Sequence, residues 1–265
     1  MTNLGTYELL NLAQRAGAQA AEHIRQSRYG KDLEIQTKSS PTDMVTKVDK
    51  ETETIIKEIL LGARPRDGFL GEESDEVTST EITWVVDPID GTTNFVYGFP
   101  VFAVSIAARD SSGTTLAGLV IDVYHDDHFY ATLEGGSFLN NRSISVSNTI
   151  SLSQALVSTG FSYDRATRVA QANTLTHLIG EVRDIRRAGA ASLDLCYLAA
   201  ARIDGYYEIG LWPWDYEAGT LIVREAGGVV ASLDSDQPRQ ELTLAGNPAI
   251  FKELRELLLA SGLTI

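Results

Sequence analysis

Cysteine and long apolar runs are nearly absent from this sequence. Cys196 is the single cysteine in 265 residues, so an internal disulfide is excluded. Its helical, apolar surroundings, Leu193 to Ala201, predict a buried thiol rather than a nucleophile. No stretch approaches the ~18 apolar residues that span a membrane, and no apolar run follows a basic start. We therefore expect a cytoplasmic protein without a membrane span or signal peptide.

Positive charge is scarce. Lysine and arginine total 22, against 36 aspartates and glutamates, which gives a net charge of −14. Such a surface repels nucleic acid and anionic lipid, so neither is expected as a general partner. An acidic protein that binds an anionic substrate needs a local source of positive charge, and metal ions are the simplest one. Arg183, Arg186 and Arg187 form one small basic stretch. This stretch is either a strand with solvated edges or an edge that helps to hold an anionic substrate or a second subunit.

Several common catalytic motifs are also missing. The sequence has no Gly-x-x-x-x-Gly-Lys-Ser/Thr, no Gly-x-Gly-x-x-Gly and no Gly-x-Ser-x-Gly. A P-loop, a dinucleotide-binding turn and a nucleophile elbow of standard form are therefore excluded. The segment His125-Asp126-Asp127-His128 contains transition-metal ligands. Its place between two apolar runs favours a polar hairpin turn instead.

The hydrophobic pattern changes between the two halves of the chain. Helices are expected at 7–26, 50–61, 165–179, 190–201, 216–226 and 247–259, and strands at 82–86, 101–108, 116–124, 129–133, 182–186, 205–208 and 229–233. Asp49 is the expected N-cap of the second helix, and Gly62 is expected just past its end. Hairpins in the first half and alternating elements in the second predict layered sheets with helices between them. We expect one domain, 1–265, with an α+β half at 1–150 and an α/β half at 151–265.

The densest chemical signal is the segment from Asp87 to Phe95, which follows an expected strand. Pro88 holds Asp87 in extended geometry, Gly91 permits a sharp turn with positive φ, and a short helix can begin at Thr92. Two carboxylates three positions apart can then converge beside free N–H groups that suit an anion. Acids next to an anion site predict cations between them. Taken alone, Asp-Pro and Asp-Gly are common pieces of turns.

Acidic residues at three further element ends strengthen this interpretation. Glu72 and Glu73 follow Gly71 at another expected strand end, while Asp49 and Asp215 stand at the starts of helices. A solvated loop explains the glutamates alone, and helix capping explains each aspartate alone. Turn chemistry at Asp87 to Phe95 does not explain why the acids recur at these other element ends.

Four segments resemble the motifs of the inositol monophosphatase family, in the family's order. Lys38 to Asp49 resembles the first motif, Gly71 to Ser74 the second, Asp87 to Phe95 the third and Trp214 to Gly219 the last. The resemblance implies an α-β-α-β-α layered sandwich, the sugar-phosphatase fold. Its first sheet is expected to be mixed and largely antiparallel, and its second sheet smaller. It also implies a phosphoric monoester hydrolase that depends on Mg²⁺ and is inhibited by Li⁺.

The resemblance also implies a role for each matching residue. The expected ligands of two to three Mg²⁺ ions are Glu72, Asp87, the carbonyl of Ile89, Asp90 and Asp215, with Asp49 helping mainly through water. The expected catalytic residues are Asp49 and Thr92, which orient the attacking water, and Glu72. The expected substrate-binding residues are Asp90, Gly91, Thr92, Gly189, Ala190, Ala191, Glu208 and Asp215, with Lys38 near the entrance.

Elementary chemistry agrees with these implied roles. Mg²⁺ prefers hard oxygen ligands and binds substrate phosphate. Two like charges ~4 Å apart repel by about 4 kcal/mol at an effective dielectric near 20, so the acids need cations to stay ionised together. We expect metal-activated water to attack directly, without a phosphoenzyme.

The substrate and the partners stay open at this stage. Inositol monophosphate is the leading substrate and histidinol phosphate its main competitor, because Glu208 can accept from a hydroxyl or pair with an amine. Some bacterial relatives also bind transcription machinery, which leaves a regulatory binding role as an alternative. Relatives are commonly dimers, so a homodimer is expected by analogy.

Overall fold

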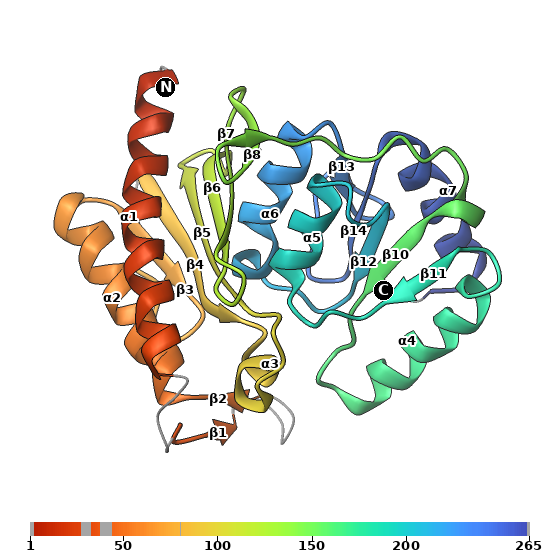
Figure 1. The fold of residues 1–265 in the computed structure, drawn as a ribbon, viewed down its shortest axis with the longest axis horizontal. Helices are drawn as coiled ribbons and strands as arrows, with labels where there is room; N and C mark the ends of the chain where they lie inside the picture. The colour runs from red at the N-terminus through yellow and green to blue at the C-terminus, as the bar shows by residue number, and fades with distance from the viewer. Residues whose placement is uncertain (1–2, 28–32, 38–43, 80, 264–265) are drawn as a thin grey trace.

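Five layers of secondary structure make up this protein (Figure 1). A computed structural model describes residues 3–27, 33–37, 44–79 and 81–263. From left to right in Figure 1, a helix pair, a large sheet, a second helix pair, a smaller sheet and a third helix pair follow one another. The three pairs are α1 (Asn3–Ser27) with α2 (Lys47–Ala63), α5 (Ala191–Ala199) with α6 (Pro213–Glu225), and α4 (Arg165–Leu178) with α7 (Pro248–Ala260). The expected layered sandwich is confirmed.

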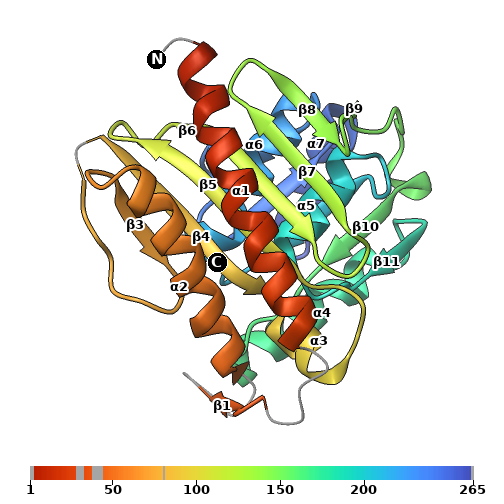
Figure 2. The ribbon, with the colours of Figure 1, turned by 60° about the vertical axis from the view of Figure 1, so that its left-hand side comes forward.

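The first sheet has seven strands in the order β3-β4-β5-β6-β7-β8-β9. Their bounds are β3 (Gly68–Gly71), β4 (Ile82–Asp90), β5 (Ala103–Asp110), β6 (Thr115–Asp122), β7 (Asp127–Thr132), β8 (Gly136–Leu139) and β9 (Arg142–Ser143). Only β3 and β4 pair in parallel, so the sheet is largely antiparallel as expected. Helices α1 and α2 cover one face (Figure 2), and α6 packs on the other. Central strands buried on both faces explain the continuous apolar runs of the sequence.

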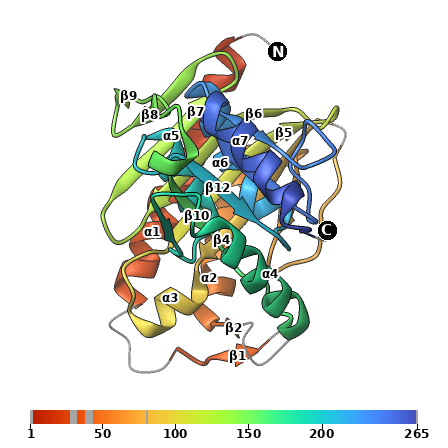
Figure 3. The same ribbon diagram turned by 90° about the vertical axis from the view of Figure 1, so that its right-hand side faces the viewer.

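The second sheet has five strands in the order β11-β10-β12-β14-β13. Their bounds are β10 (Leu156–Thr159), β11 (Asp184–Arg186), β12 (Gly205–Glu208), β13 (Val229–Ala231) and β14 (Thr243–Gly246). Helices α4 and α7 lie over its outer side in Figure 3. The sequence did not predict β10 and β14, because four-residue strands with small and hydroxyl side chains give little periodic signal. A two-stranded sheet of β1 (Gln36–Thr37) and β2 (Met44–Val45) was also not predicted.

The predicted start of the second helix was wrong. Helix α2 begins at Lys47, and Thr46 is its N-cap, with its hydroxyl accepting from the backbone N–H of Val48 and Asp49. Asp49 is the third residue of the helix, and its Oδ2 accepts from Thr46 N at 2.8 Å. This capping box moves the boundary one turn earlier than a search for a single acidic cap suggests. Gly62 lies inside the helix, which ends at Ala63.

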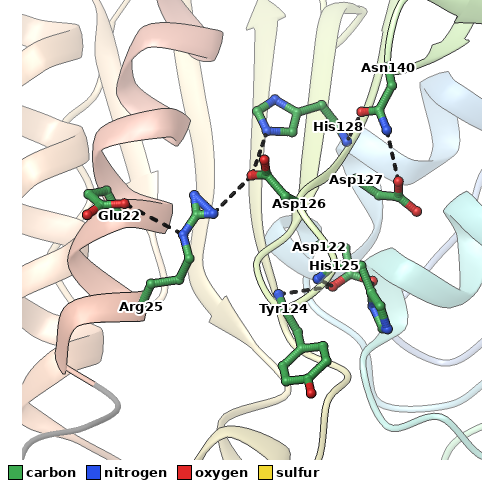
Figure 4. Close-up of polar contacts among 9 residues, drawn as sticks. All are labelled: Glu22, Arg25, Asp122, Tyr124, His125, Asp126, Asp127, His128 and Asn140. Atoms are coloured by element: carbon green, nitrogen blue, oxygen red, sulfur yellow. Dashed lines mark hydrogen bonds and ion pairs between the residues drawn. The ribbon is translucent and has the colours of Figure 1, made fainter.

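The predicted hairpin turn is present. His125 and Asp126 lie in the turn that joins β6 to β7, Asp127 and His128 begin β7, and the side chains of the segment contact several different neighbours (Figure 4). Asp126 accepts from Arg25 Nη1 of α1 at 2.9 Å, and His125 Nδ1 lies 2.8 Å from Asp122 Oδ2. The turn therefore ties the end of α1 to the large sheet.

The structure also bears on the predictions about Cys196 and about long apolar segments. Cys196 is buried within α5, as its neighbours indicated. In the described part of the chain, no helix combines the length and the apolar character that a membrane crossing needs.

Candidate active site

A cavity of about 570 Å³ gathers the residues that the motifs singled out. Its walls come from the ends of β3, β4 and β12 and from the beginnings of α3 (Thr92–Tyr97), α5 and α6. The predicted residues that line it are Glu72, Asp87, Ile89, Asp90, Gly91, Thr92, Gly189, Ala191, Glu208 and Asp215. Segments far apart in the sequence thus meet at one hollow. The roles of these residues are argued below as a proposal.

The turn after β4 positions the central acids of the cavity. The pairing of β4 with β5 is irregular between Asp87 and Asp90, which breaks the regular alternation of the strand. Asp87 Oδ1 accepts from Ile89 N at 3.0 Å. Gly91 then has a φ of 89°, as the sequence predicted. The positive φ favours glycine, and a Cβ at this position would also lie only 3.0 Å from the carbonyl oxygen of Val101, a tight contact.

Thr92 joins the cavity to Asp49. The Thr92 hydroxyl lies 3.0 Å from Asp49 Oδ1 and 3.0 Å from the carbonyl oxygen of Ile89, both of which are acceptors. Asp49 is fully buried, with 0% of its surface exposed, and its other oxygen is held by Thr46. The carboxylate is therefore fixed behind the hydroxyl, and Thr92 is the member of the pair that lines the cavity.

Asp90 links the large sheet to the start of α5. Its Oδ1 accepts from Ala191 N at 3.2 Å, and its Oδ2 accepts from Ser192 N at 2.7 Å and from Ser192 Oγ at 2.5 Å. Burial raises the pKa of Asp90, and the hydrogen bonds from Ser192 oppose that rise. Sequence reasoning missed Ser192. Its position at the start of an expected helix, a common place for a hydroxyl, was the available signal.

Two other acids of the cavity, Asp215 and Glu208, also hold protons more tightly than usual. Burial, followed by the charges of Glu72 and Asp90, raises the pKa of Asp215 well above its ordinary value. Burial raises the pKa of Glu208 to about 7, although the Tyr206 hydroxyl donates to Glu208 Oε2 at 2.8 Å. Asp194 of α5, which does not line the cavity and which sequence reasoning missed, also has a pKa raised well above normal by burial. The site therefore destabilises its own negative charge.

Asp215 is not the N-cap residue of α6, which was the alternative explanation for this aspartate; the N-cap is Trp212. The helix begins at Pro213, and Asp215 is its third residue. Its Oδ2 accepts from Trp212 N at 2.7 Å. Trp212 and Trp214 stack with ring centroids 5.5 Å apart and line the cavity. The aromatic segment before Asp215 thus forms part of the cavity wall.

The charges around the cavity are strongly unbalanced. Six acidic side chains line it, namely Glu72, Asp87, Asp90, Asp164, Glu208 and Asp215. Among the described residues that line it, Arg187 is the only basic one. Arg183 donates to the carbonyl of Gln154, and Arg186 pairs with Asp184. Of the basic stretch, only Arg187 is placed to meet a bound anion.

The donor set fits a hard divalent cation. In the described part of the chain, no group of three or more His, Cys, Asp or Glu side chains is already arranged around one metal position. A carboxylate offers about four lone-pair positions to hydrogen-bond donors or metal ions. Asp90 uses three of these positions for the hydrogen bonds described above, and Asp215 uses one. Both carboxylates therefore still have acceptor capacity. All the atoms that these side chains and the Ile89 carbonyl offer to a metal ion are oxygens, the ligands that Mg²⁺ prefers. Lys38 and the rest of 38–43 lie outside the described residues.

Comparisons with known proteins agree with the motifs and the fold. The sequence model of the inositol monophosphatase family matches residues 6–261. The chain is 42% identical over 266 residues to inositol-1-monophosphatase SuhB of Mycobacterium tuberculosis, with 93% of this chain and 91% of that protein covered. It is 38% identical over 255 residues to the Nus factor SuhB of Escherichia coli, with 94% of each covered.

A solved structure gives the same result. The extragenic suppressor protein SuhB of Bartonella henselae matches with a TM-score of 0.90 and 36% identity, over 95% of this chain and 98% of that one. Motifs in order, a shared fold and similarity along nearly the whole length therefore agree. The chain belongs to the inositol monophosphatase family, a family of phosphoric monoester hydrolases.

Proposed function

We propose that this protein hydrolyses a small phosphate monoester with the help of Mg²⁺, and that inositol monophosphate is its substrate. The observation that carries the proposal is the imbalance of six acids and one arginine around the cavity. An anionic phosphate cannot enter such a site without cations that reverse its charge. The name inositol-1-monophosphatase, which the M. tuberculosis relative bears, supports the choice of substrate.

Two to three Mg²⁺ ions would be held by the carboxylates around the end of β4. Glu72, Asp87 and the carbonyl of Ile89 would hold a first ion. Asp87, Asp90 and Asp215 would hold a second, and Glu72 with Asp49 would help to hold a weaker third. Bound there, Mg²⁺ supplies charge neutralisation for the phosphoryl group and lowers the pKa of a coordinated water. Because burial disfavours the ionised form of these acids, a bound cation would also stabilise their negative charges.

Thr92 and Asp49 orient the water that attacks phosphorus. The buried Asp49 carboxylate accepts the Thr92 proton at 3.0 Å, which leaves the hydroxyl oxygen as an acceptor toward the cavity. A water that donates to this oxygen has its own lone pair directed away from Thr92. Neither side chain becomes phosphorylated, because a largely dissociative transition state needs positioning and charge neutralisation more than a protein nucleophile.

The two halves of the cavity divide the recognition of the substrate. The backbone N–H groups of Gly91 and Thr92, at the turn into α3, face the phosphate. The polyol lies against Gly189, Ala191 and Glu208. Asn94 Nδ2 donates to the carbonyls of Val101 and Ala188 at 2.7 and 2.9 Å, which holds the 188–189 segment beside α3. Glu208 selects hydroxyl groups, since Tyr206 occupies only one side of its carboxylate.

Histidinol phosphate is the main competing substrate, because Glu208 can also pair with an amine. Phosphate release should be measured with inositol 1-phosphate, histidinol phosphate, fructose 1,6-bisphosphate and 3′-phosphoadenosine 5′-phosphate. We expect the highest kcat/KM with inositol 1-phosphate. A higher value with histidinol phosphate would replace the substrate and keep the chemistry. Release from none of the four would refute the proposed function.

A second role in transcription rests on one observation, the name Nus factor SuhB carried by the E. coli relative. A pull-down of transcription factors with the wild-type chain and with Asp215→Asn separates this role from catalysis. Retention by both forms indicates binding that is independent of turnover, and retention by neither leaves hydrolysis alone. The predicted homodimer, the cytoplasmic location and the inhibition by Li⁺ stay predictions.

A further inference from the structure

Glu53 is a buried acidic residue that none of the four motifs includes. It lies in α2, is 2% exposed, and does not line the catalytic cavity. Helix α2 packs against β3, which ends just before Glu72, and against β4, which contains Asp87 (Figure 2). Burying an acidic side chain costs free energy unless hydrogen bonds compensate, so the position of Glu53 calls for an explanation.

The partner of Glu53 is the backbone of the segment from Gly71 to Ser74. Glu53 Oε2 accepts from Glu73 N at 2.8 Å, across 20 positions of the sequence. A hydrogen bond from an N–H to a carboxylate is stronger than one between neutral groups. This bond therefore ties the segment to α2 at the residue that directly follows Glu72.

The missing side chain of Gly71 leaves room for the Glu53 carboxylate. A Cβ at Gly71 would overlap Glu53 Oε2 and would lie 2.6 Å from the ring of Phe69. Gly71 ends the strand β3 and does not have a positive φ. Close approach of another side chain, rather than an unusual backbone conformation, therefore explains the glycine that opens the second motif.

The same face of α2 also holds the hydroxyl proposed to orient water. Asp49 and Glu53 are four positions apart, so they are neighbours on one helix face. Asp49 Oδ1 accepts from the Thr92 hydroxyl at 3.0 Å, and Glu53 accepts from Glu73 N. Two buried carboxylates on α2 thus fix two parts of the cavity wall, the start of α3 and the segment that carries Glu72.

A residue outside the cavity acts on the reaction only through its neighbours. Metal ligands are commonly held in place by hydrogen bonds from residues around them, and losing such support weakens metal binding by about 10–100-fold. Resting on the proposed function, in which Glu72 helps to hold Mg²⁺, we propose that Glu53 is a positioning residue. Its bond to Glu73 N fixes Glu72 and thereby sets the affinity of the cavity for Mg²⁺.

The test compares Glu53→Met with Glu53→Gln. Methionine keeps the length of the side chain and removes the acceptor, whereas glutamine keeps an amide oxygen that can accept from Glu73 N. Calorimetric titration of the metal-free full chain with Mg²⁺ should show binding about tenfold weaker in Glu53→Met and within about threefold of wild type in Glu53→Gln. The Mg²⁺ concentration for half-maximal phosphate release should rise in parallel. A purely structural role would lower the melting temperature in EDTA and leave the Mg²⁺ affinity unchanged.

The matched control is Lys57→Met, one turn further along α2. Lys57 Nζ donates to Ser74 Oγ at 3.2 Å in an exposed contact and lies over the ring of Phe69. The control therefore removes a contact between the same helix and the same segment but leaves the bond to Glu73 N. Mg²⁺ affinity should stay within about twofold of wild type, because exposed contacts contribute little.

Gly71→Ala disturbs the same contact from the other side and should also weaken Mg²⁺ binding, so the outcome does not depend on the folding of Glu53→Met. Circular dichroism shows which variants are folded. Wild-type Mg²⁺ affinity in either folded variant would overturn the proposal, as would equal weakening in Glu53→Met and Glu53→Gln. Failure of the proposed function gives a different result, because the wild-type chain itself then does not bind Mg²⁺.

Discussion

Helix α6 lines two cavities, and their charged side chains are balanced differently. At its first turn, Asp215 faces a cavity with six acids and one arginine, and burial raises the pKa values of Asp90, Glu208 and Asp215. Along its side, Glu217 is paired with Arg109 in a cavity whose charges are satisfied. Two cavities of similar size on one helix thus differ in their need for a cation. Unbalanced acids call for cations, whereas a carboxylate that is already paired with an arginine does not.

The largest expected effect comes from removing one charge of the first cavity. Asp215→Asn should lower kcat/KM for inositol 1-phosphate on the order of 10³-fold, because a metal-binding charge is lost. The matched change on the same helix, Thr220→Val, should leave kcat/KM within about twofold, because a change on the second cavity does not alter the acids of the first. Steady-state phosphate release measures both. Near-normal turnover in Asp215→Asn would remove Asp215 from the metal site.

The free energy of unfolding should depend on pH, because burial disfavours the ionised form of the acids in the first cavity. Glu208 has a pKa of about 7 in the folded protein, against an ordinary value of 4.5. The folded state therefore binds the proton more tightly, and the free energy of unfolding falls as pH rises from about 4.5 to about 7. Glu208 accounts for at most about 3 kcal/mol of this fall. The raised pKa values of Asp90 and Asp215 act in the same direction.

Thermal unfolding in EDTA at pH 5 and pH 7.5 measures this fall. Mg²⁺ should reduce it, because cations favour the ionised carboxylates. Glu208→Gln should make stability in EDTA depend less on pH than it does in the wild type. Equal pH dependence in the two proteins would show that Glu208 is not strained by burial.

A smaller effect is expected at the hydroxyl that orients water. Thr92→Val removes the hydrogen bond to Asp49 and should lower kcat about 10²-fold with little change in KM. Thr92→Ser keeps the hydroxyl and should retain most of the activity. If the serine and valine variants were equally slow, the methyl group rather than the hydroxyl would be the important part of Thr92.

The smallest effect concerns recognition of the polyol. Glu208→Gln should raise KM for inositol 1-phosphate about tenfold, because a charged acceptor of hydroxyl protons is replaced by a neutral amide. With p-nitrophenyl phosphate, which has no hydroxyls on its leaving group, KM should be unchanged. A similar rise with both substrates would assign Glu208 to the phosphate or to the metal site instead.

The sequence predicted the layers and the cavity better than the contacts within them. Strong periodicity located α1, α7 and the central strands of the large sheet, and the motif around Gly91 predicted a positive φ that the backbone adopts. The short strands β10 and β14 were missed because four residues carry too little periodic signal. Ser192 was missed because its bond to Asp90 joins residues 102 positions apart. The Asp49 cap was placed wrongly, since the reciprocal bonds with Thr46 depend on local geometry.

The most direct test of the central claim is the metal dependence of phosphate release. The chain should be dialysed against EDTA until no metal is detected, assayed with inositol 1-phosphate, and then titrated with Mg²⁺. We predict that activity disappears after dialysis and returns saturably with Mg²⁺, and that Asp215→Asn does not recover under the same titration. Full turnover by the metal-free wild-type chain would contradict the claim that its gathered acids work by holding cations.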